Sequence, residues 1–569
     1  MKPLLTKKRI VWLALAAAGI LALILPGRAL IESDGFMKTL APQPPGPQDK
    51  GDPKLDYALN KFLRLAETEG MDKAREFAAR RRFDFEGDHV RVVIEAQRPE
   101  SGLQIQSVVA FLSDEVKALG GQVETTHQNL IQSSLRPGTL RALAANPHVG
   151  YIRLPLKPVP LAVISEGVER TRANAWTVNP YRRSDEVKVA IFDLGFKNYK
   201  SVLGTELPSS VTTRSFRTDL DLEADEVHGT ACAEIVYDMM PDAQFYLVNF
   251  STDVEHGNAV NWMLNQGINV ISYSVGWYNA GDGRGTGPIC EDVKAADNRG
   301  VKWISAAGND ALRHWTGTFS DPNGNTFHNF TPDDEILQIY VEAYTEVAFF
   351  LNWDDWGTWS GTGYTSSSQD YDMYMWYWTG ATWQYIDESE NWQRGSGYHD
   401  LPTESIGYYY SSKSTYWGVS IKKYKTTRDC MLELFTYGNL SSNPCEYNVV
   451  EGSLLIPADS QYAIAVGATD CITDAYHTYS SRGPTHDGRI KPDFSAPSGV
   501  STSSVAYGSR GFYGTSAATP HMAGGLALVF GKTPFTLDQV KDILEKRALD
   551  LGPAGKDNQF GIGRLKLAN

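Results

Sequence analysis

Four near-continuous apolar runs constrain the fold of this chain more than any other feature of its sequence. They lie between residues 187 and 308 and read VKVAIFD, AQFYLVNF, GINVISYSV and GVKWISAAG. Helix-length segments separate them, and strands that are buried on both faces of a parallel sheet have this texture. The sequence therefore predicts an α/β domain with a parallel sheet. The pattern begins at about Glu186, stops near residue 311, and resumes with YAIAVGA at 462–468.

Polar residues stand where these runs end. Asp193 closes the first run, Asn309 follows the fourth, and His228 opens HGTACAEIV, which is typical of the start of a buried helix. Ligands of open α/β sheets bind at the carboxyl ends of the strands. We therefore expect these three side chains to face one crevice.

A serine hemmed in by small residues occurs far along the chain, in GTSAATPHMAGG at 514–525. Pro520 is tolerated in the first turn of a helix, so the pattern predicts a helix that begins near Ser516. Its hydroxyl would lie at the positive end of the helix dipole, among free N–H groups. Small neighbours would let another chain approach. Taken alone, a serine N-cap before a buried helix explains the motif equally well.

Together these residue types suit acyl transfer. A serine hydroxyl becomes nucleophilic when a histidine takes its proton, and a buried aspartate orients that histidine. An asparagine side chain and a backbone N–H can hold the oxyanion that forms. Each motif alone has an ordinary interpretation as a turn, a capped helix or a loop. Only the ordered set indicates catalysis.

The ordered motifs resemble those of the subtilisin-like serine proteases, the subtilases. They are VAIFDLG, HGTACAEIV, VISYSVG, ISAAGN, YSSRGP and GTSAATPHMAGG, within residues 187–310 and 452–530. The resemblance implies an exported serine endopeptidase with the triad Asp193, His228 and Ser516, and with Asn309 in the oxyanion hole. It also implies that two segments flank the substrate chain and its primary pocket: Ser274, Val275 and Gly276, and Ala306, Ala307 and Gly308.

One position departs from the family pattern. Leu194 stands where the family usually has threonine or serine after the aspartate. A hydroxyl that could hydrogen-bond the Asp193 carboxylate is therefore missing, and one such bond contributes about 1 kcal/mol, or more when it is charged. We expect this change to tune the enzyme without abolishing its activity.

The N-terminal segment is predicted to be a signal peptide over 1–29. Lysines and Arg9 precede an apolar run over 10–25, and small residues follow at a plausible cleavage site. The run is shorter than the about 20 residues of a membrane span. An uncleaved anchor is the alternative, and only then would the protein contact a membrane. We expect a secreted, periplasmic or cell-envelope protein, in which a proline-rich linker occupies 30–54.

A small domain is predicted over 55–160. Its core, 89–155, has the element order β-α-β-β-α-β of a ferredoxin-like α+β domain. By resemblance this domain matches a subtilase propeptide, so the enzyme would be made as a zymogen. The segment 154–166, LPLKPVPLAVISE, has no helical or strand period and contains prolines. We expect the enzyme to cut itself there.

An all-β sandwich module is predicted over 312–451, inserted into a catalytic domain that comprises 161–311 and 452–569. Tryptophan-rich alternating runs such as DYDMYMWYW indicate this module, which weakly resembles the β-sandwich modules of secreted peptidases. Structural calcium is possible, with solvated turns as the alternative interpretation of its four candidate carboxylates, Asp354, Asp355, Asp370 and Asp372. The chemistry requires no cofactor. Cys430 and Cys445 are predicted to form a disulfide, and Cys232, Cys290 and Cys471 are expected to be buried thiols.

The charge balance limits the partners. A formal net charge of −14 argues against nucleic acid, which binds basic patches. Protein or peptide substrates are what the subtilase resemblance implies. The acidic run 219–226 reads as a solvated loop beside the cleft, or as a preference for basic substrates. A different class remains open: a non-catalytic extracellular binding protein whose β insert captures ligand. The complete triad argues against it.

Overall fold

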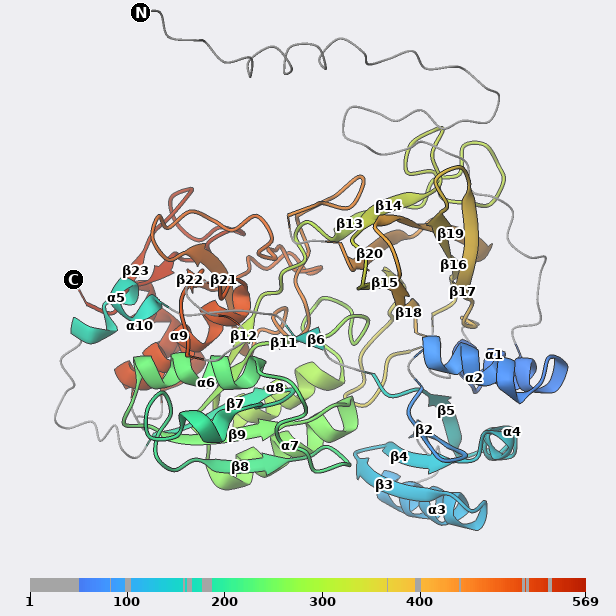
Figure 1. Ribbon diagram of the computed structural model, residues 1–569, viewed down its shortest axis with the longest axis horizontal. Coiled ribbons are helices and arrows are strands. Elements are labelled where there is room, and N and C mark those ends of the chain that lie inside the picture. Colours follow the sequence, from blue (N-terminus) through green and yellow to red (C-terminus); the bar gives the residue numbers. More distant parts are fainter. Residues whose placement is uncertain are drawn as a thin grey trace, which may run out of the picture.

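The computed structural model describes most of the chain from residue 51 onward. The described residues are 51–81, 83–97, 104–156, 159–160, 166–175, 187–365, 367–393, 401–439, 442–503, 507, 511–530 and 535–568. The predicted signal peptide and nearly all of the predicted linker lie outside them. Figure 1 shows an N-terminal unit, a central α/β unit and a β-rich unit.

A nine-stranded sheet forms the centre of the α/β unit, which confirms the predicted fold class. Its strand order is β23-β24-β22-β21-β12-β10-β7-β9-β8, and every neighbouring pair is parallel except β23 with β24. From β7 the chain continues to β9 on one side and later to β10 on the other, so β7 marks the switch point. The strands are β7 (Lys188–Asp193), β8 (Thr212–Ser215), β9 (Gln244–Asn249), β10 (Val270–Tyr273), β12 (Lys302–Ala306), β21 (Ala463–Asp470), β22 (Phe494–Ser498), β23 (Ala548–Leu549) and β24 (Arg564–Leu565).

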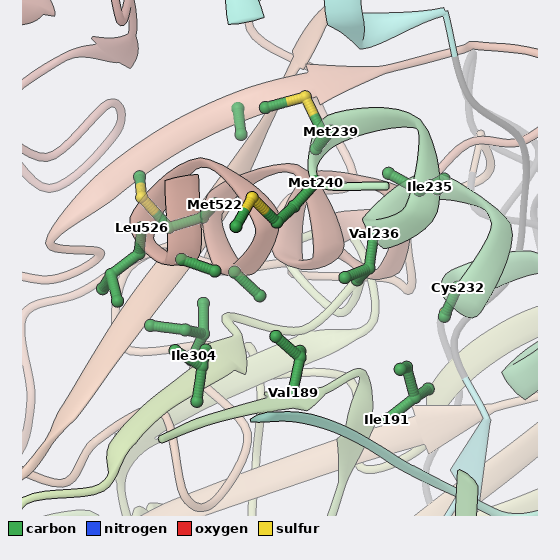
Figure 2. Packing of buried hydrophobic residues seen from close by; sticks show 14 of the residues in the cluster. Val189, Ile191, Cys232, Ile235, Val236, Met239, Met240, Ile304, Met522 and Leu526 are labelled. Carbon is green, nitrogen blue, oxygen red and sulfur yellow. The ribbon is translucent and has the colours of Figure 1, made fainter. Parts of the chain in front are cut away.

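Helices cover both faces of this sheet because its strands are apolar on both sides. Alternate residues of β7 enter different cores: Val189 and Ile191 pack on one face, Ala190 and Phe192 on the other. The first core, seen in Figure 2, is shared with α6 (His228–Met239), α9 (Thr515–Phe530) and α10 (Leu537–Glu545). The second is shared with α7 (Asp253–Gln266) and α8 (Pro288–Asn298). A short helix, α5 (Gly167–Thr171), also contacts β22.

The N-terminal unit contains an antiparallel sheet with the order β5-β2-β4-β3, and β1 also pairs with β2. Over 89–153 its elements follow the order β-α-β-β-α-β. The strands are β1 (Phe85–Glu86), β2 (His89–Ala96), β3 (Gln122–His127), β4 (Leu130–Leu135) and β5 (Val149–Arg153). The helices are α1 (Tyr57–Thr68), α2 (Met71–Arg80), α3 (Ile105–Ala118) and α4 (Leu140–Ala144).

The β-rich unit consists of two four-stranded antiparallel sheets, β13-β20-β15-β18 and β14-β19-β16-β17. Both contribute to one apolar cluster, which includes Trp353 and Trp417. The strands are β13 (His314–Thr318), β14 (Leu337–Val341), β15 (Thr345–Trp353), β16 (Asp370–Trp378), β17 (Trp383–Ser389), β18 (Thr403–Ser411), β19 (Thr415–Lys425) and β20 (Met431–Tyr437).

This unit lies in the connection between two adjacent strands of the central sheet, β12 and β21. Its two ends meet, because the backbone N–H of Cys445 donates to the Leu312 carbonyl at 2.8 Å. The returning chain then bonds Leu455 N–H to the Ala307 carbonyl at 3.0 Å. The parallel pairing of β12 with β21 is therefore uninterrupted. The residue limits of the domains stay a prediction.

The predicted disulfide is wrong. None of the five cysteines forms a disulfide, and all five are buried. Cys430 and Cys445 both lie in the apolar cluster between the two sheets, where the Cys445 thiol donates to the His314 carbonyl at 3.7 Å. The module is thus held together by apolar burial rather than by a crosslink. Among the described residues, no helix combines the length and apolar character needed to cross a bilayer.

Candidate active site

Asp193 and His228 form a buried pair at the switch point of the sheet. Asp193 ends β7, and His228 opens α6, where its Nδ1 lies 2.8 and 2.9 Å from the two carboxylate oxygens of Asp193. Both side chains are 1% exposed. Burial lowers the pKa of His228, but the charge and hydrogen bond of Asp193 outweigh it, and the net shift is upward. The structure thus places side by side two residues that the sequence predicts to face one crevice.

Leu194, the departure from the family pattern, contributes to this pair through its backbone. Its N–H donates to Asp193 Oδ1 at 2.8 Å. Its side chain is half-buried and packs against the core that includes Phe250. The Asp193 carboxylate therefore has a hydrogen-bond donor at this position even without a hydroxyl.

Ser516 is the second residue of α9, close to the predicted start. Pro520, expected in the first turn, instead lies inside the helix. Because proline has no N–H, the Ser516 carbonyl lacks its intrahelical donor. It accepts hydrogen bonds from Ser274 Oγ at 3.1 Å and from Cys232 Sγ at 3.8 Å instead. These side chains explain why the helix tolerates the proline there.

The hydroxyl of Ser516 and the free ring nitrogen of His228 are both enclosed. Ser516 is 0% exposed, and its Oγ donates a long hydrogen bond to the Ser274 carbonyl at 3.4 Å. His228 Nε2 is buried and has no hydrogen-bond partner within the described part of the chain. An unpaired buried nitrogen of this kind can accept a proton. Catalytic hydrogen bonds are often loose before substrate binds.

Asn309 is fixed by a residue that the sequence reasoning missed. Its Oδ1 accepts from Thr515 N–H at 2.9 Å and from Thr515 Oγ1 at 3.2 Å. Thr515 Oγ1 also accepts the Gly308 N–H at 3.2 Å. With the amide oxygen bound beside Ser516, the Asn309 NH₂ group remains available as a donor. The hydroxyl next to the serine in GTSA was the available signal.

The six predicted substrate-binding residues lie in two buried segments. Ser274 precedes β11 (Val275–Gly276), and Ala306, Ala307 and Gly308 end β12 and follow it. Gly308 has φ +113°, and a Cβ there would lie 2.7 Å from Ser481 Oγ. A side chain at this position would thus meet both strain and a clash.

One segment of the chain already pairs with this strand. β6 (Val159–Pro160) runs antiparallel to β11, with Val275 opposite Pro160 and Gly276 opposite Val159. The segment predicted to be cut therefore includes residues that lie along the predicted substrate strand. Residues 157–158 and 161–165 of that segment lie outside the described residues.

Cys232 lies one turn after His228 in α6, close to the pair of Asp193 and His228. Asp193, His228 and Cys232 offer ligand atoms within 4.8 Å of one another, the one such group of three or more among the described residues. Burial, and then the Asp193 charge, raise the pKa of the Cys232 thiol well above its usual value. A neutral thiol is a poor metal ligand.

The four candidate calcium carboxylates do not form such a group. Asp354 pairs with Arg428 at 2.7 Å. Asp355 Oδ2 accepts from Ser367 Oγ at 2.8 Å and from two backbone N–H groups. Asp370 and Asp372 are buried within β16. The backbone N–H of Gln393 also donates to Asp370 Oδ2 at 3.4 Å, so protein donors contact at least three of the four carboxylates.

Known protein families and proteins are similar to this chain. The model of the subtilase family matches residues 184–423 and 403–563. The chain belongs to the subtilase family. It is 35% identical over 136 residues to serine protease AprX of Bacillus subtilis (strain 168), which is 20% of this chain and 30% of that protein. It is 42% identical over 62 residues to an extracellular serine protease of Serratia marcescens, which is 11% of this chain and 6% of that protein.

The matches to these curated relatives thus span less than a third of each relative's length. Among solved structures, this subtilase is similar to the CspB protease of Clostridium perfringens. The identity is 16%, the TM-score is 0.48, and the match covers 70% of this chain and 96% of that one.

Proposed function

We propose that this subtilase is a serine endopeptidase that hydrolyses peptide bonds through an acyl-enzyme on Ser516. The observation that carries the proposal is the aligned, buried pair of Asp193 and His228, whose Nε2 has no hydrogen-bond partner among the described residues. Cys232 links this pair to Ser516, because its Sγ lies within 4.8 Å of their ligand atoms and donates to the Ser516 carbonyl at 3.8 Å. Family membership supports it, and protein or peptide chains are its substrates. The alternative of a non-catalytic binding protein is not favoured by the family match or by the relatives named as serine proteases.

The first half of the reaction transfers the acyl group. His228 Nε2 takes the hydroxyl proton as Ser516 Oγ attacks the carbonyl carbon of the substrate, and Asp193 stabilises the imidazolium that forms. The oxyanion accepts hydrogen bonds from the Asn309 NH₂ group and from the N–H of Ser516, which has no intrahelical partner in the first turn of α9. When the carbon–nitrogen bond breaks, His228 gives its proton to the departing amine.

The second half releases the product. Water enters where the amine left, and His228 takes a proton from it as its oxygen attacks the ester carbon. The bond to Ser516 Oγ then breaks, and the proton returns from His228 to the serine. The reaction needs no redox partner, and every proton is accounted for by His228, the substrate and one water.

The N-terminal domain acts in this proposal as a propeptide, and the protein is exported as a zymogen. The pairing of β6 with β11 supports this role, because it lays the linking segment along the strand assigned to substrate. It also suggests one bond. In a substrate chain paired with β11 in this register, the residue after the one opposite Val275 comes next to Ser274, whose carbonyl contacts Ser516 Oγ at 3.4 Å. Because Pro160 is the residue opposite Val275, we expect cleavage one residue later, between Leu161 and Ala162.

The experiment that tests the nucleophile is labelling with a fluorophosphonate, which reacts with activated serines. The wild-type protein should be labelled, and Ser516→Ala should not be, while its circular dichroism stays unchanged. Ser360→Ala, in an exposed loop of the inserted module, is the matched control and should label fully. Labelling that survives in Ser516→Ala would overturn the assignment.

A further inference from the structure

Two helices of the N-terminal domain contact the inserted β module through charged groups. Lys61, on α1, places its Nζ 3.0 Å from Asp387 Oδ1 and 2.8 Å from Glu388 Oε1. Arg81, the residue that caps α2, places its Nε 2.7 Å from Asp387 Oδ2. Both carboxylates lie on β17, which Figure 1 shows beside these helices.

These ion pairs are buried. The Arg81 side chain is 5% exposed, and those of Asp387 and Glu388 are each 2% exposed. Burial raises the pKa of Asp387, but the charges of Arg81 and Lys61 outweigh it and hold the pKa at about 2. A buried charge that loses its partner is strongly destabilised. Each side of this interface therefore depends on the other for its charges to stay buried.

Arg81 also donates hydrogen bonds to the backbone of the module. Its Nη1 donates to the Ser405 carbonyl at 2.8 Å and its Nη2 to the Glu388 carbonyl at 2.5 Å. Glu388 is on β17 and Ser405 is on β18, so one guanidinium spans the edge strands of both sheets. A fork of fixed donors that meets a carboxylate and two carbonyls is a specific contact rather than a chance approach of charges.

Tyr57, at the start of α1, adds hydrogen bonds from an uncharged residue to this contact. Its hydroxyl hydrogen-bonds Glu388, and its backbone N–H donates to Asn391 Oδ1 at 2.9 Å. On the other side, Tyr409 donates its hydroxyl to Asp387 Oδ2 at 2.6 Å. The two carboxylates are thus held in place both by the module itself and by the N-terminal domain.

The N-terminal domain is held separately by the catalytic domain. Arg153 Nη2 lies 2.7 Å from Asp253 Oδ2, on α7. Thr252 Oγ1 donates to Gln132 Oε1 at 2.7 Å. Neither contact includes the segment that links the two domains. The N-terminal domain therefore has two attachment surfaces besides the covalent link, one on the catalytic domain and one on the insert.

We propose that the inserted β module is a docking site that keeps the N-terminal domain bound after the link between them is cut. Asp387 and Glu388 form the acidic half of the site, and Lys61 and Arg81 form the cationic half. The cut itself rests on the proposed function; the docking does not. The insert thereby adds a second non-covalent attachment, besides the one on the catalytic domain, that holds the N-terminal domain after the cut.

The test uses the full chain with Ser516→Ala, so that it cannot cut itself. Residues 161–165 are replaced by a longer glycine- and serine-rich linker that contains a thrombin site, and thrombin makes the cut. Size-exclusion chromatography and the dissociation rate then report whether the N-terminal fragment stays. The cut parent chain should elute as one complex. Asp387→Asn and Lys61→Met should each raise the dissociation rate by about 10²-fold.

A matched acid-to-amide control lies on the same module. Asp354→Asn removes an exposed ion pair with Arg428 and should leave the dissociation rate unchanged. Circular dichroism and thermal unfolding check that each variant is folded, and Lys61→Met changes a partly exposed side chain outside the module. Prompt dissociation of the cut parent, or equal retention in Asp387→Asn, Lys61→Met and the parent, would overturn the proposal.

The two proposals fail independently in this design. Thrombin makes the cut in a chain that lacks Ser516, so the docking result stands even if the protein never cuts itself. Conversely, loss of docking in Asp387→Asn says nothing about the nucleophile, which the fluorophosphonate experiment tests.

Discussion

Hydrogen bonds fix the orientation of the Asn309 side-chain amide. Its oxygen is bound by the N–H and the hydroxyl of Thr515, which leaves its NH₂ group to donate. Asn309→Ala should therefore lower kcat by roughly 10²–10³ with little change in KM, because the donated bond forms mainly in the transition state. Steady-state kinetics with a peptide substrate measures both constants. A change confined to KM would place Asn309 in substrate binding instead.

The titration of His228 gives a second residue-scale prediction. The general base must be neutral, and the pKa of His228 is raised above 6.5 because Asp193 outweighs the effect of burial. kcat/KM should therefore rise with pH through a midpoint above 6.5. The ion pair stabilises the fold below pH 6.5, and this stabilisation is lost as pH rises through the folded-state pKa.

Asp193→Asn checks the cause of that midpoint. It should move the midpoint of kcat/KM to lower pH and lower kcat by about 10⁴-fold. An unchanged midpoint would show that another group sets the pKa of His228.

Leu194→Thr tests the departure from the family pattern. We expect it to be tolerated and to raise activity modestly, by adding a hydroxyl beside a carboxylate that now accepts the Leu194 N–H. The matched control is Leu194→Val, which keeps an apolar, branched side chain without the hydroxyl. A large loss of kcat in the threonine variant alone would show that its hydroxyl is buried without a partner.

At the residue scale, the sequence predicted features that lie within one motif and missed contacts between residues far apart in the chain. The residues of the candidate triad stand in recognisable motifs, and each lies where its motif placed it, at a strand end or a helix start. The Thr515 contact with Asn309 and the free state of Cys430 and Cys445 depend on side chains far apart in sequence. Residue spacing carries no information about such contacts.

Elements of the central sheet were predictable because burial on both faces leaves a continuous apolar run. The runs VKVAIFD and AQFYLVNF correspond to β7 and β9. The predicted and observed ends agree to within about two residues, which is the usual uncertainty of element ends. The sequence did not predict that α9 would contain Pro520 in its interior. This position depends on Ser274 and Cys232, which satisfy the Ser516 carbonyl from other elements.

The inserted module gives an element-scale prediction. Leu351, on β15, is fully buried between the two sheets, so Leu351→Ala should lower the free energy of unfolding by about 2–5 kcal/mol. Met431→Ala, at a side chain 47% exposed on β20, is the control and should have little effect. Both variants should keep fluorophosphonate labelling, since the candidate triad belongs to other elements. Thermal unfolding and labelling measure the two effects.

The three units of the molecule contact one another. The catalytic domain supplies β11, the linking segment supplies β6, and the N-terminal domain rests on both α7 and the insert. The contacts of the N-terminal domain with α7 and with the insert could not be predicted from the sequence, because they join residues a hundred or more positions apart. The order of elements within each unit could be predicted.

The contact between the N-terminal domain and α8 predicts how pH affects the whole assembly. Burial lowers the pKa of His127, but Asp292, 3.6 Å away, and then Asp253 raise it more, so the net shift is upward. The stabilisation from this pair is present below pH 6.5 and is lost as pH rises through the bound-state pKa. The thrombin-cut complex should therefore dissociate more slowly at pH 6 than at about pH 8.5. His127→Gln should remove that difference, and a faster release of the parent at pH 6 would contradict it.

Intact mass spectrometry and N-terminal sequencing of the purified wild-type protein and of Ser516→Ala test the central claim most directly. The claim is that Ser516 cuts the chain between the N-terminal domain and the catalytic domain. The wild-type protein should yield a second N-terminus at Ala162, at a rate independent of protein concentration, while Ser516→Ala stays joined across that bond. Cleavage of Ser516→Ala at the same bond without added protease, or full peptidase activity of an uncut wild-type chain, would contradict the claim.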